Sequence, residues 1–324
     1  MANSRGISHK EKVMKHLFII NPHCGKGISY ERCSDGIVEA MKDAGITDYD
    51  IHITTGPRDG YEYAKKEVDK GEPIRVYACG GDGTLYEVVN ACACKKNAEV
   101  AAFPLGSGND FIRIFGDKRS LRNVADHVNG TPMEFDLIKC GDEYAINQCS
   151  MGLDAEVCAR QSDFKKLPFI KGEAAYTLSL LYCFIGKMKS TFTIQIDDDE
   201  PFTTDVLFAV SGNSRWYGGG YMAAPKALTY DGLLDFVVVK KDCTRLKLLS
   251  LINPYKNGQH LGWDRTLYKR GKKMTVKSTK PAAVNVDGEC KIVTEATFEI
   301  IEKGIKFVVP ACSDFMERVK NNNV

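Results

Sequence analysis

The sequence predicts an α/β N-terminal domain with a parallel sheet, followed by a C-terminal antiparallel β-sandwich domain. Up to about residue 130, strand-like apolar runs alternate with helix-like segments, which is the pattern of βαβ units. Beyond that point, short alternating segments are separated by Gly, Asp and Pro, and strands without intervening helices favour antiparallel pairing. A chain of 324 residues also exceeds the usual size of one hydrophobic core, so two domains are expected.

The elements of the first half follow one another in strict alternation. Strands are expected at residues 16–20, 49–54, 74–79 and 100–105, and helices at residues 28–44, 60–70 and 85–94. Strands separated by helices of this length need crossover connections, so the sheet that they form is parallel. We therefore expect an N-terminal extension at residues 1–15 and a nucleotide-binding α/β domain at residues 16–130.

The second half consists mainly of short strands. They are expected at residues 133–140, 144–148, 191–196, 205–211, 234–239, 273–277, 296–301 and 306–309, with one helix at residues 173–187. The β-sandwich domain is expected to span residues 131–310. Residues 311–324 form a C-terminal tail, with a helix predicted at residues 312–320.

Charge and hydropathy narrow the cellular setting. Forty-four basic and 42 acidic residues leave a formal charge of +2, which provides no bulk attraction to nucleic acid or to an anionic membrane. The longest nearly uncharged apolar run, residues 177–186, is far shorter than the ~20 residues that span a bilayer, and the polar N-terminus has no secretion signal. We expect a cytosolic protein whose twelve cysteines are free thiols rather than disulfides or metal ligands.

Three glycine-containing segments each follow a predicted strand of the first domain. Residues 21–27 read Asn-Pro-His-Cys-Gly-Lys-Gly, and their amides and Lys26 suit a phosphate, although an ordinary turn is also consistent with them. Residues 80–84 read Gly-Gly-Asp-Gly-Thr, where glycines permit close backbone approach to phosphates and Asp82 can hold a metal ion. Residues 105–111 read Leu-Gly-Ser-Gly-Asn-Asp-Phe, which are residue types that bind ribose, phosphate or magnesium.

Two acidic segments in the second half are ambiguous on their own. Asp231-Gly232 precedes a strand and Asp287-Gly288-Glu289 lies between two strands, but Asp-Gly is also the commonest hairpin turn signal. Residues 218–223 match a loose dinucleotide-binding pattern, yet Pro225 follows where a helix should continue, and no βαβ unit surrounds them. A nicotinamide site is therefore not expected there.

Taken together and in this order, these segments resemble the bacterial diacylglycerol kinase-type lipid kinases, with sphingosine and ceramide kinases as more distant relatives. The resemblance runs from about His16 to Pro310. The Gly-Gly-Asp-Gly-Thr element is shared with NAD kinases and phosphofructokinases, so the whole set carries the resemblance. That set comprises Asn21-Pro22 with Gly25, Thr54 followed by Asp59, residues 106–111, Asp231-Gly232-Leu233 and Asp287-Gly288-Glu289.

The resemblance implies a NAD kinase/diacylglycerol kinase-like fold, ATP and Mg²⁺ as cofactors, and a role for each matching residue. Contacts to ATP are implied for Asn21, Gly25, Lys26, Thr54, Gly80, Gly81, Asp82, Gly83, Thr84, Ser107 and Asn109. Asp231, with the main-chain oxygens of Leu228 and Leu233, matches the magnesium positions. Glu289 matches the general base, with Asp82 as its competitor. Tyr86 and Cys24 stand where the family usually has Asn and Ser or Thr, which puts side-chain contacts to nucleotide there in doubt.

These observations predict a lipid kinase that transfers the γ-phosphate of ATP to a lipid hydroxyl, most simply converting diacylglycerol to phosphatidic acid. The basic segment from Lys269 to Lys280 could contact anionic head groups at the inner face of the membrane, or it could be a solvated strand. A kinase of a soluble alcohol and a non-catalytic nucleotide- or lipid-binding regulator are the alternatives. The sequence does not decide whether the protein forms a homodimer.

Overall fold

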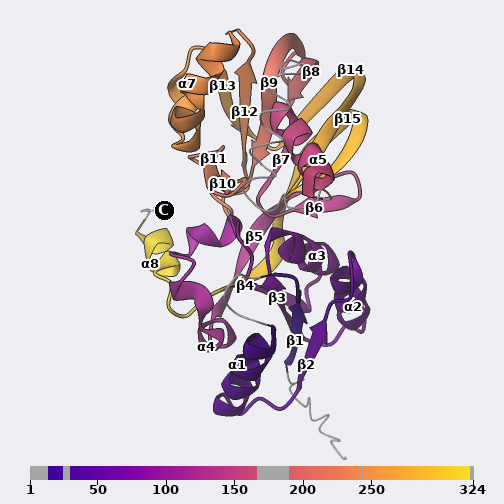
Figure 1. Cartoon of the computed structure of the whole chain (residues 1–324), viewed down its shortest axis with the longest axis vertical. Helices are drawn as coiled ribbons and strands as arrows, with labels where there is room; N and C mark the ends of the chain where they lie inside the picture. Colours follow the sequence, from indigo (N-terminus) through magenta and orange to yellow (C-terminus); the bar gives the residue numbers. More distant parts are fainter. Residues whose placement is uncertain (1–13, 25–29, 166–189, 243, 322–324) are drawn as a thin grey trace, which may run out of the picture.

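The computed structural model describes residues 14–24, 30–165, 190–242 and 244–321 (Figure 1). The predicted helix at residues 173–187 and the apolar run within it lie outside the described residues, as do Gly25 and Lys26. Within the described part of the chain, no helix is long and apolar enough to cross a membrane.

A parallel sheet forms the N-terminal half, as predicted. Its strand order is β2-β1-β3-β4. The strands are β1 (Lys15–Ile20), β2 (Tyr49–Ile53), β3 (Ile74–Gly80) and β4 (Ala98–Pro104), and the crossover helices are α1 (Tyr30–Asp43), α2 (Asp59–Val68) and α3 (Asp82–Cys92). Every residue of β3 is buried, which is expected for a parallel strand covered by helices on both faces.

Alternating residues of these strands enter two separate cores. Leu17 and Ile19 pack in one core with Val88 and Val89 of α3. Phe18 packs in the other, with residues of α1 that recur at helical spacing, namely Cys33, Ile37, Ala40 and Met41. The period of two along the strands and of 3.6 along the helix therefore fixes which side of the sheet each helix covers.

The second half is an antiparallel assembly, which confirms the predicted fold class. Its strands pair in the order β13-β12-β9-β7-β14-β15, with β8 against β14 and β9, and β5 against β15 and β6. The bounds are β5 (Thr131–Cys140), β6 (Glu143–Ala145), β7 (Gln148–Gly152), β8 (Ser190–Ile196), β9 (Phe202–Gly212), β12 (Leu234–Lys240), β13 (Thr266–Gly271), β14 (Lys273–Val286) and β15 (Glu289–Val309).

One strand, β15, joins the two halves. Its first part pairs with β14 in the upper half of Figure 1, and its last part runs parallel to β4, with Lys306 opposite Glu99. The prediction of two strands at 296–301 and 306–309 was therefore wrong. The register shifts between Ile301 and Ile305, where Lys303 has a φ of 52°, and this irregularity interrupts the alternating pattern without ending the strand.

Several shorter elements complete the chain. They are η1 (Phe111–Ile114), η2 (Ser120–Arg122), α4 (Val124–Val128), α5 (Leu153–Lys165), the hairpin strands β10 (Trp216–Tyr217) and β11 (Tyr221–Met222), α7 (Arg245–Lys256), η3 (Gln259–Gly262) and α8 (Phe315–Lys320). Helices α5 and α7 were not predicted. Pro254 lies inside α7, and such a residue argues against a helix in any reading of local sequence.

Candidate active site

The turn from β3 to α3 exposes backbone amides at the carboxyl edge of the parallel sheet. Gly81 is the N-cap of α3, and as a glycine it has no side chain that could accept a hydrogen bond from the first amides of the helix. Gly80 must be glycine, because a Cβ there would lie 2.2 Å from the Thr84 hydroxyl oxygen. Helix amides and the helix dipole together make such a turn a binding place for an anion such as phosphate.

The segment after β4 folds against this turn. The amides of Leu105 and Gly106 both donate to the Gly80 carbonyl at 3.0 Å. Gly106 approaches so closely that a Cβ on it would lie 2.4 Å from the Cα of Gly81. The two glycine motifs, separate in the sequence, therefore form one backbone surface, and Ser107 lies exposed beside it.

Asp82 ties the two loops together. Its two carboxylate oxygens accept hydrogen bonds from the amides of Asn109 and Asp110, each at 2.8 Å. Gly108 leaves room for this carboxylate, since a Cβ there would lie 2.4 Å from Asp82 Oδ2. The Asn109 side chain donates to the Gly80 carbonyl at 3.0 Å, while its buried Oδ1 has no hydrogen-bond partner. Asp82 thus acts structurally as an anchor for the loop that carries Ser107.

Of the predicted motif at residues 21–27, the structure describes residues 21–24, and these residues lie near the turn from β3 to α3. Asn21 follows β1, and its Nδ2 lies 3.5 Å from the Thr84 hydroxyl. Cys24 lies close to Gly81, and burial raises the pKa of its thiol. Thr54 is buried at the end of β2, where its amide donates to the Ile20 carbonyl at 2.9 Å. Asp59 bonds the amide and hydroxyl of Thr55, so its described role is to cap the turn before α2.

Two further charged residues lie at this site: Lys118, which was not predicted, and Asp110, which belongs to the predicted segment 105–111 but was given no role of its own. Lys118 donates from Nζ to the Gly106 carbonyl, and burial lowers the pKa of its ammonium group. Asp110 accepts a bond from the Gly219 amide at 2.7 Å, which connects the loop after β4 to the β10–β11 hairpin of the second half. Burial and the neighbouring Asp82 raise the pKa of Asp110. Lys118 has no glycine pattern around it that would have marked it in the sequence.

The Asp287–Glu289 turn lies beside α3. Asp287, with a φ of 48°, accepts bonds from the amides of Ile146 (2.6 Å) and Gln148 (2.7 Å). Burial raises the pKa of Asp287 to about 7, while these backbone bonds oppose the shift and the charge of Asp82 adds to it. The predicted strand at 144–148 is split into β6 and β7, and the amides of Ile146 and Asn147, which lie between these two strands, bond Asp287 instead of a neighbouring strand.

Tyr86 indicates where Glu289 lies. It is on α3, one turn beyond Asp82, and its pKa is raised by burial, by a hydrogen bond to Glu143 and by the charges of Glu289 and Asp287. Glu289 itself is exposed at the first position of β15. The structure therefore brings the predicted base and the Gly-Gly-Asp-Gly-Thr helix to the same junction between the two halves.

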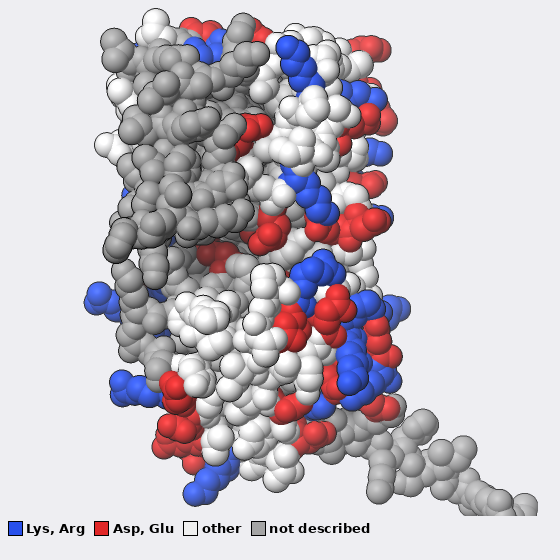
Figure 2. All heavy atoms as spheres, turned by 45° about the vertical axis from the view of Figure 1, so that its right-hand side comes forward, with Lys and Arg blue, Asp and Glu red and all other residues white. Residues whose placement is uncertain are grey.

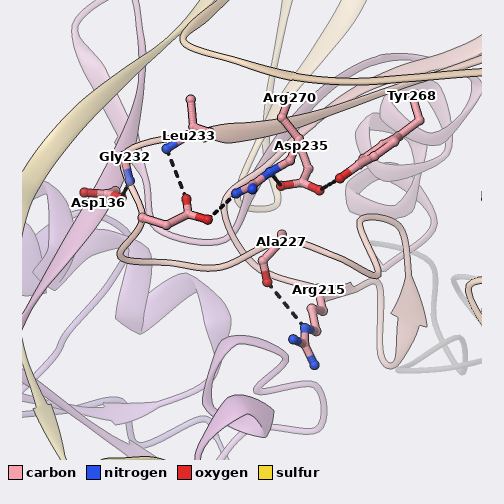
Figure 3. Close-up of polar contacts among 9 residues, drawn as sticks. Asp136, Arg215, Ala227, Gly232, Leu233, Asp235, Tyr268 and Arg270 are labelled. Atoms are coloured by element: carbon pink, nitrogen blue, oxygen red, sulfur yellow. Dashed lines mark hydrogen bonds and ion pairs between the residues drawn. The ribbon is translucent and has the colours of Figure 1, made fainter. Parts of the chain in front are cut away.

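Asp231 lies in a separate cluster on the second half. Its Oδ1 accepts from the Leu233 amide at 3.1 Å, and its Oδ2 pairs with the Arg270 guanidinium. Figure 3 labels these two partners, together with Asp235 and Tyr268. Arg270 also lies 3.4 Å from Asp235, a fully buried carboxylate that accepts from the Tyr268 hydroxyl at 2.6 Å. Leu228 lines a small neighbouring pocket with Arg215 and Tyr230. A cation at Asp231 would have to share its carboxylate with a guanidinium.

The predicted magnesium set of Leu228, Asp231 and Leu233 consequently stays a prediction. Among the described residues, no group of three or more His, Cys, Asp or Glu side chains is arranged to hold a metal ion. The positive charge that neutralises Asp231 comes from β13, a strand whose pairing with β12 brings Arg270 opposite Asp235.

Arg270→Met is expected to lower the free energy of unfolding by about 2–4 kcal/mol, because Asp235 would remain buried with only Tyr268 as a partner. Urea denaturation measures the loss. Lys269→Met is the matched control on the same strand, since its partner Asp199 is exposed and the pair should contribute less than about 1 kcal/mol. Equal losses in the two variants would contradict the pairing described here.

Comparison with known protein families assigns the chain to one of them. The profile of the diacylglycerol kinase catalytic domain matches residues 15–140. The profile of the YegS C-terminal NAD kinase beta sandwich-like domain matches residues 147–309, about half of the chain. The chain belongs to the YegS-like and diacylglycerol kinase family of lipid kinases. It is therefore a kinase by family, and its family implies the use of ATP.

Individual relatives agree with the assignment. A diacylglycerol kinase of Bacillus subtilis is 27% identical over 305 residues, which cover 92% of this chain and 97% of the relative. A protein of Shewanella frigidimarina named "Probable lipid kinase YegS-like" is 29% identical over 241 residues, covering 73% of this chain and 76% of the relative. A crystal structure of a diacylglycerol kinase from Bacillus anthracis superposes with a TM-score of 0.66 at 20% identity, over 91% of this chain and 96% of that one, and supports the fold.

Proposed function

We propose that this lipid kinase transfers the γ-phosphate of ATP to the hydroxyl of diacylglycerol and so makes phosphatidic acid. The observation that carries the proposal is the position of Asp82, which anchors both glycine loops at the start of α3, beside the turn that bears Glu289. Relatives named diacylglycerol kinase match over nine-tenths of the chain and point to the acceptor.

The phosphates would lie against the backbone surface made by Gly81, Gly106 and Ser107. Amides at the start of α3 face this surface, and the Lys118 ammonium adjoins it through the Gly106 carbonyl. Asn21, Thr84 and Asn109 supply further polar groups next to the same surface. Fixed donors of this kind position the phosphates and stabilise the charge that spreads over the transferred group.

Mg²⁺ neutralises phosphate charge in such reactions when it is bound. Among the described residues, Asp82 and Asp110 are the carboxylates best placed to hold it, because they adjoin each other at the glycine loops, where the Asp110 amide donates to Asp82 at 2.8 Å. Each of their oxygens already accepts or pairs with one donor and retains a further lone pair. Arg113 pairs with Asp110 at 3.0 Å just as Arg270 pairs with Asp231, so a cation at either place would share a carboxylate with a guanidinium. Asp82 and Asp110 are preferred because they lie at the glycine loops, where the phosphates would bind.

Glu289 would accept the proton of the lipid hydroxyl. Its place at the first residue of β15 holds it on a rigid sheet, and Asp287 fixes the turn through its bonds to the amides between β6 and β7. Burial, Glu143 and the charges of Glu289 and Asp287 raise the pKa of Tyr86, so this turn lies near α3. A positioned carboxylate of this kind typically contributes about 10²–10⁴-fold to the rate.

The proposal includes the membrane: a cytoplasmic protein would meet its lipid substrate at the surface of the inner leaflet. It includes no nucleic-acid partner, and it is compatible with a monomer or a homodimer. The basic segment from Lys269 to Lys280 gives little support for binding to anionic head groups. Three of its lysines are already paired with carboxylates of this chain, namely Lys269, Lys272 and Lys277. Acidic and basic side chains are interspersed on the face shown in Figure 2. Recognition of the lipid would therefore depend more on apolar contacts than on net charge.

The test is transfer of labelled phosphate from ATP to lipids dispersed in detergent, with products identified by mass spectrometry. We expect labelled phosphatidic acid from diacylglycerol, and none from the Asp82→Asn variant. Labelling of ceramide, sphingosine or another lipid instead would move the proposal to that acceptor. Labelling of a soluble alcohol, or ATP binding without transfer to any acceptor, would favour the soluble-substrate kinase or the non-catalytic regulator and overturn it.

A further inference from the structure

Two cysteines that the reaction does not use meet across the base of the Glu289 turn. Cys158 is on α5 and Cys290 is the second residue of β15, directly after Glu289. The Cys158 thiol donates to the Gly288 carbonyl at 3.2 Å, and the Cys290 thiol lies 3.8 Å from the Ala155 carbonyl of α5. Each sulfur therefore reaches the segment that carries the other one.

The two thiols are also close neighbours. The Cys158 side chain lies within hydrogen-bonding reach of the Cys290 thiol, and this neighbour, together with burial, raises the pKa of Cys290. Ala155, three residues before Cys158, is on the same face of α5 and is fully buried, so the helix is held against the sheet at this point. Glu156 adds a bond from the Ala283 amide of β14 at 3.0 Å.

We propose that Cys158 and Cys290 are a site of reversible oxidative modification, at which peroxides form an intramolecular disulfide that fixes the Glu289 turn to α5. A disulfide needs two cysteines whose backbones already lie at the separation found in packed neighbouring segments. The crossed contacts of the two thiols show that α5 and the start of β15 are packed neighbours at this point. The inference rests on the proposed function only for its effect on turnover.

The chemistry balances with a peroxide as oxidant. The Cys158 thiolate attacks one peroxide oxygen, the O–O bond breaks, and a sulfenic acid and one water form after protonation. The Cys290 sulfur then attacks the sulfenic sulfur, the S–O bond breaks, and a second water leaves. In sum, two thiols and one hydrogen peroxide give one disulfide and two waters. Cys158 reacts first, because the raised pKa of Cys290 keeps that thiol protonated.

The disulfide would change turnover because it alters the surroundings of Gly288 and Cys290, the residues on either side of Glu289. Closing the two sulfurs to bonding distance removes the Cys158 thiol as a donor to the Gly288 carbonyl, which precedes Glu289. A shift of the general base by a fraction of an ångström is enough to reduce proton transfer in the transition state. Cys33 on α1 and Cys79 on β3 form another neighbouring pair, but both are buried in the core between that helix and the sheet, away from peroxide in solution.

The disulfide itself is tested without any kinase assay. The purified full-length chain is treated with hydrogen peroxide, blocked with N-ethylmaleimide, digested without reduction and mapped by mass spectrometry. We expect a linked peptide pair containing Cys158 and Cys290, which dithiothreitol separates, and its loss in Cys158→Ser. Cys312→Ser is the matched control, since Cys312 is an exposed thiol elsewhere, and it should keep the link. A dominant Cys33–Cys79 link, or stable sulfinic acid at Cys158 without a link, would overturn the proposal.

The effect on turnover is measured separately on the same samples. We expect oxidised wild type to lose at least about five-fold in kcat and to recover with dithiothreitol, while Cys158→Ser keeps its activity through the same treatment. A mapped link with unchanged kcat would overturn the effect on the turn while leaving the modification site in place. Absence of lipid phosphorylation in the reduced protein would instead reject the proposed function, and the mapping result would stand.

Discussion

Glu289→Gln is expected to lower kcat for lipid phosphorylation by about 10²–10⁴-fold, while the affinity for ATP stays close to that of the wild type. The substitution keeps the size and hydrogen bonding of the side chain and removes only its basicity. Glu289 is exposed at the start of β15, and its charge contributes to the raised pKa of Tyr86 on α3. Steady-state kinetics at saturating lipid, with ATP binding measured by calorimetry, give the two quantities.

Asp82→Asn provides the contrast, because Asp82 is the other carboxylate that could accept the proton. Both of its oxygens are engaged by the amides of Asn109 and Asp110, so the change should weaken ATP binding and the fold of the loop together. Glu295→Gln is the matched control on the same strand, where the carboxylate pairs with Lys277, and its kcat should stay within about two-fold of the wild type. Near-normal kcat for Glu289→Gln at saturating lipid would make Asp82 the better candidate for the base.

Local pattern was enough to predict the frame of the first half. The strands β1, β3 and β4 are mostly apolar, α1 has one apolar face, and each glycine motif follows its strand at the edge where ligands bind in open sheets. The juxtaposition of residues 80–84 with residues 105–110 follows from parallel neighbours β3 and β4, whose carboxyl ends must meet. This part of the candidate site could therefore be expected before the structure.

Contacts between distant segments could not be predicted in the same way. The bond from Gly219 to Asp110 joins residues more than a hundred positions apart, and so do the bonds of Asp287 to the amides between β6 and β7. The pairing of Arg270 with Asp231 depends on the register between β12 and β13, which a single sequence does not reveal. Lys118 reaches the Gly106 carbonyl only because the chain turns back after η1.

Gly106→Ala is expected to lower the affinity for ATP by more than ten-fold and to destabilise the fold by about 2–4 kcal/mol. The added Cβ would lie 2.4 Å from the Cα and 3.1 Å from the amide nitrogen of Gly81. Both are backbone atoms of the turn into α3, so no side-chain rotation can relieve the contact. The loop would have to move away, and with it the two amides that donate to the Gly80 carbonyl.

Gly262→Ala separates this effect from the general cost of replacing glycine. Gly262 ends η3 in the second half, has open space around the added Cβ and should change neither ATP affinity nor stability by more than about 0.5 kcal/mol. Calorimetry with ATP and urea denaturation on both variants give the comparison. The close approach of Gly106 to Gly81 joins the two glycine motifs into one surface. If Gly106→Ala kept the ATP affinity of the wild type, the nucleotide would not bind at that surface. Lost affinity with preserved stability would instead place the phosphates directly against Gly106.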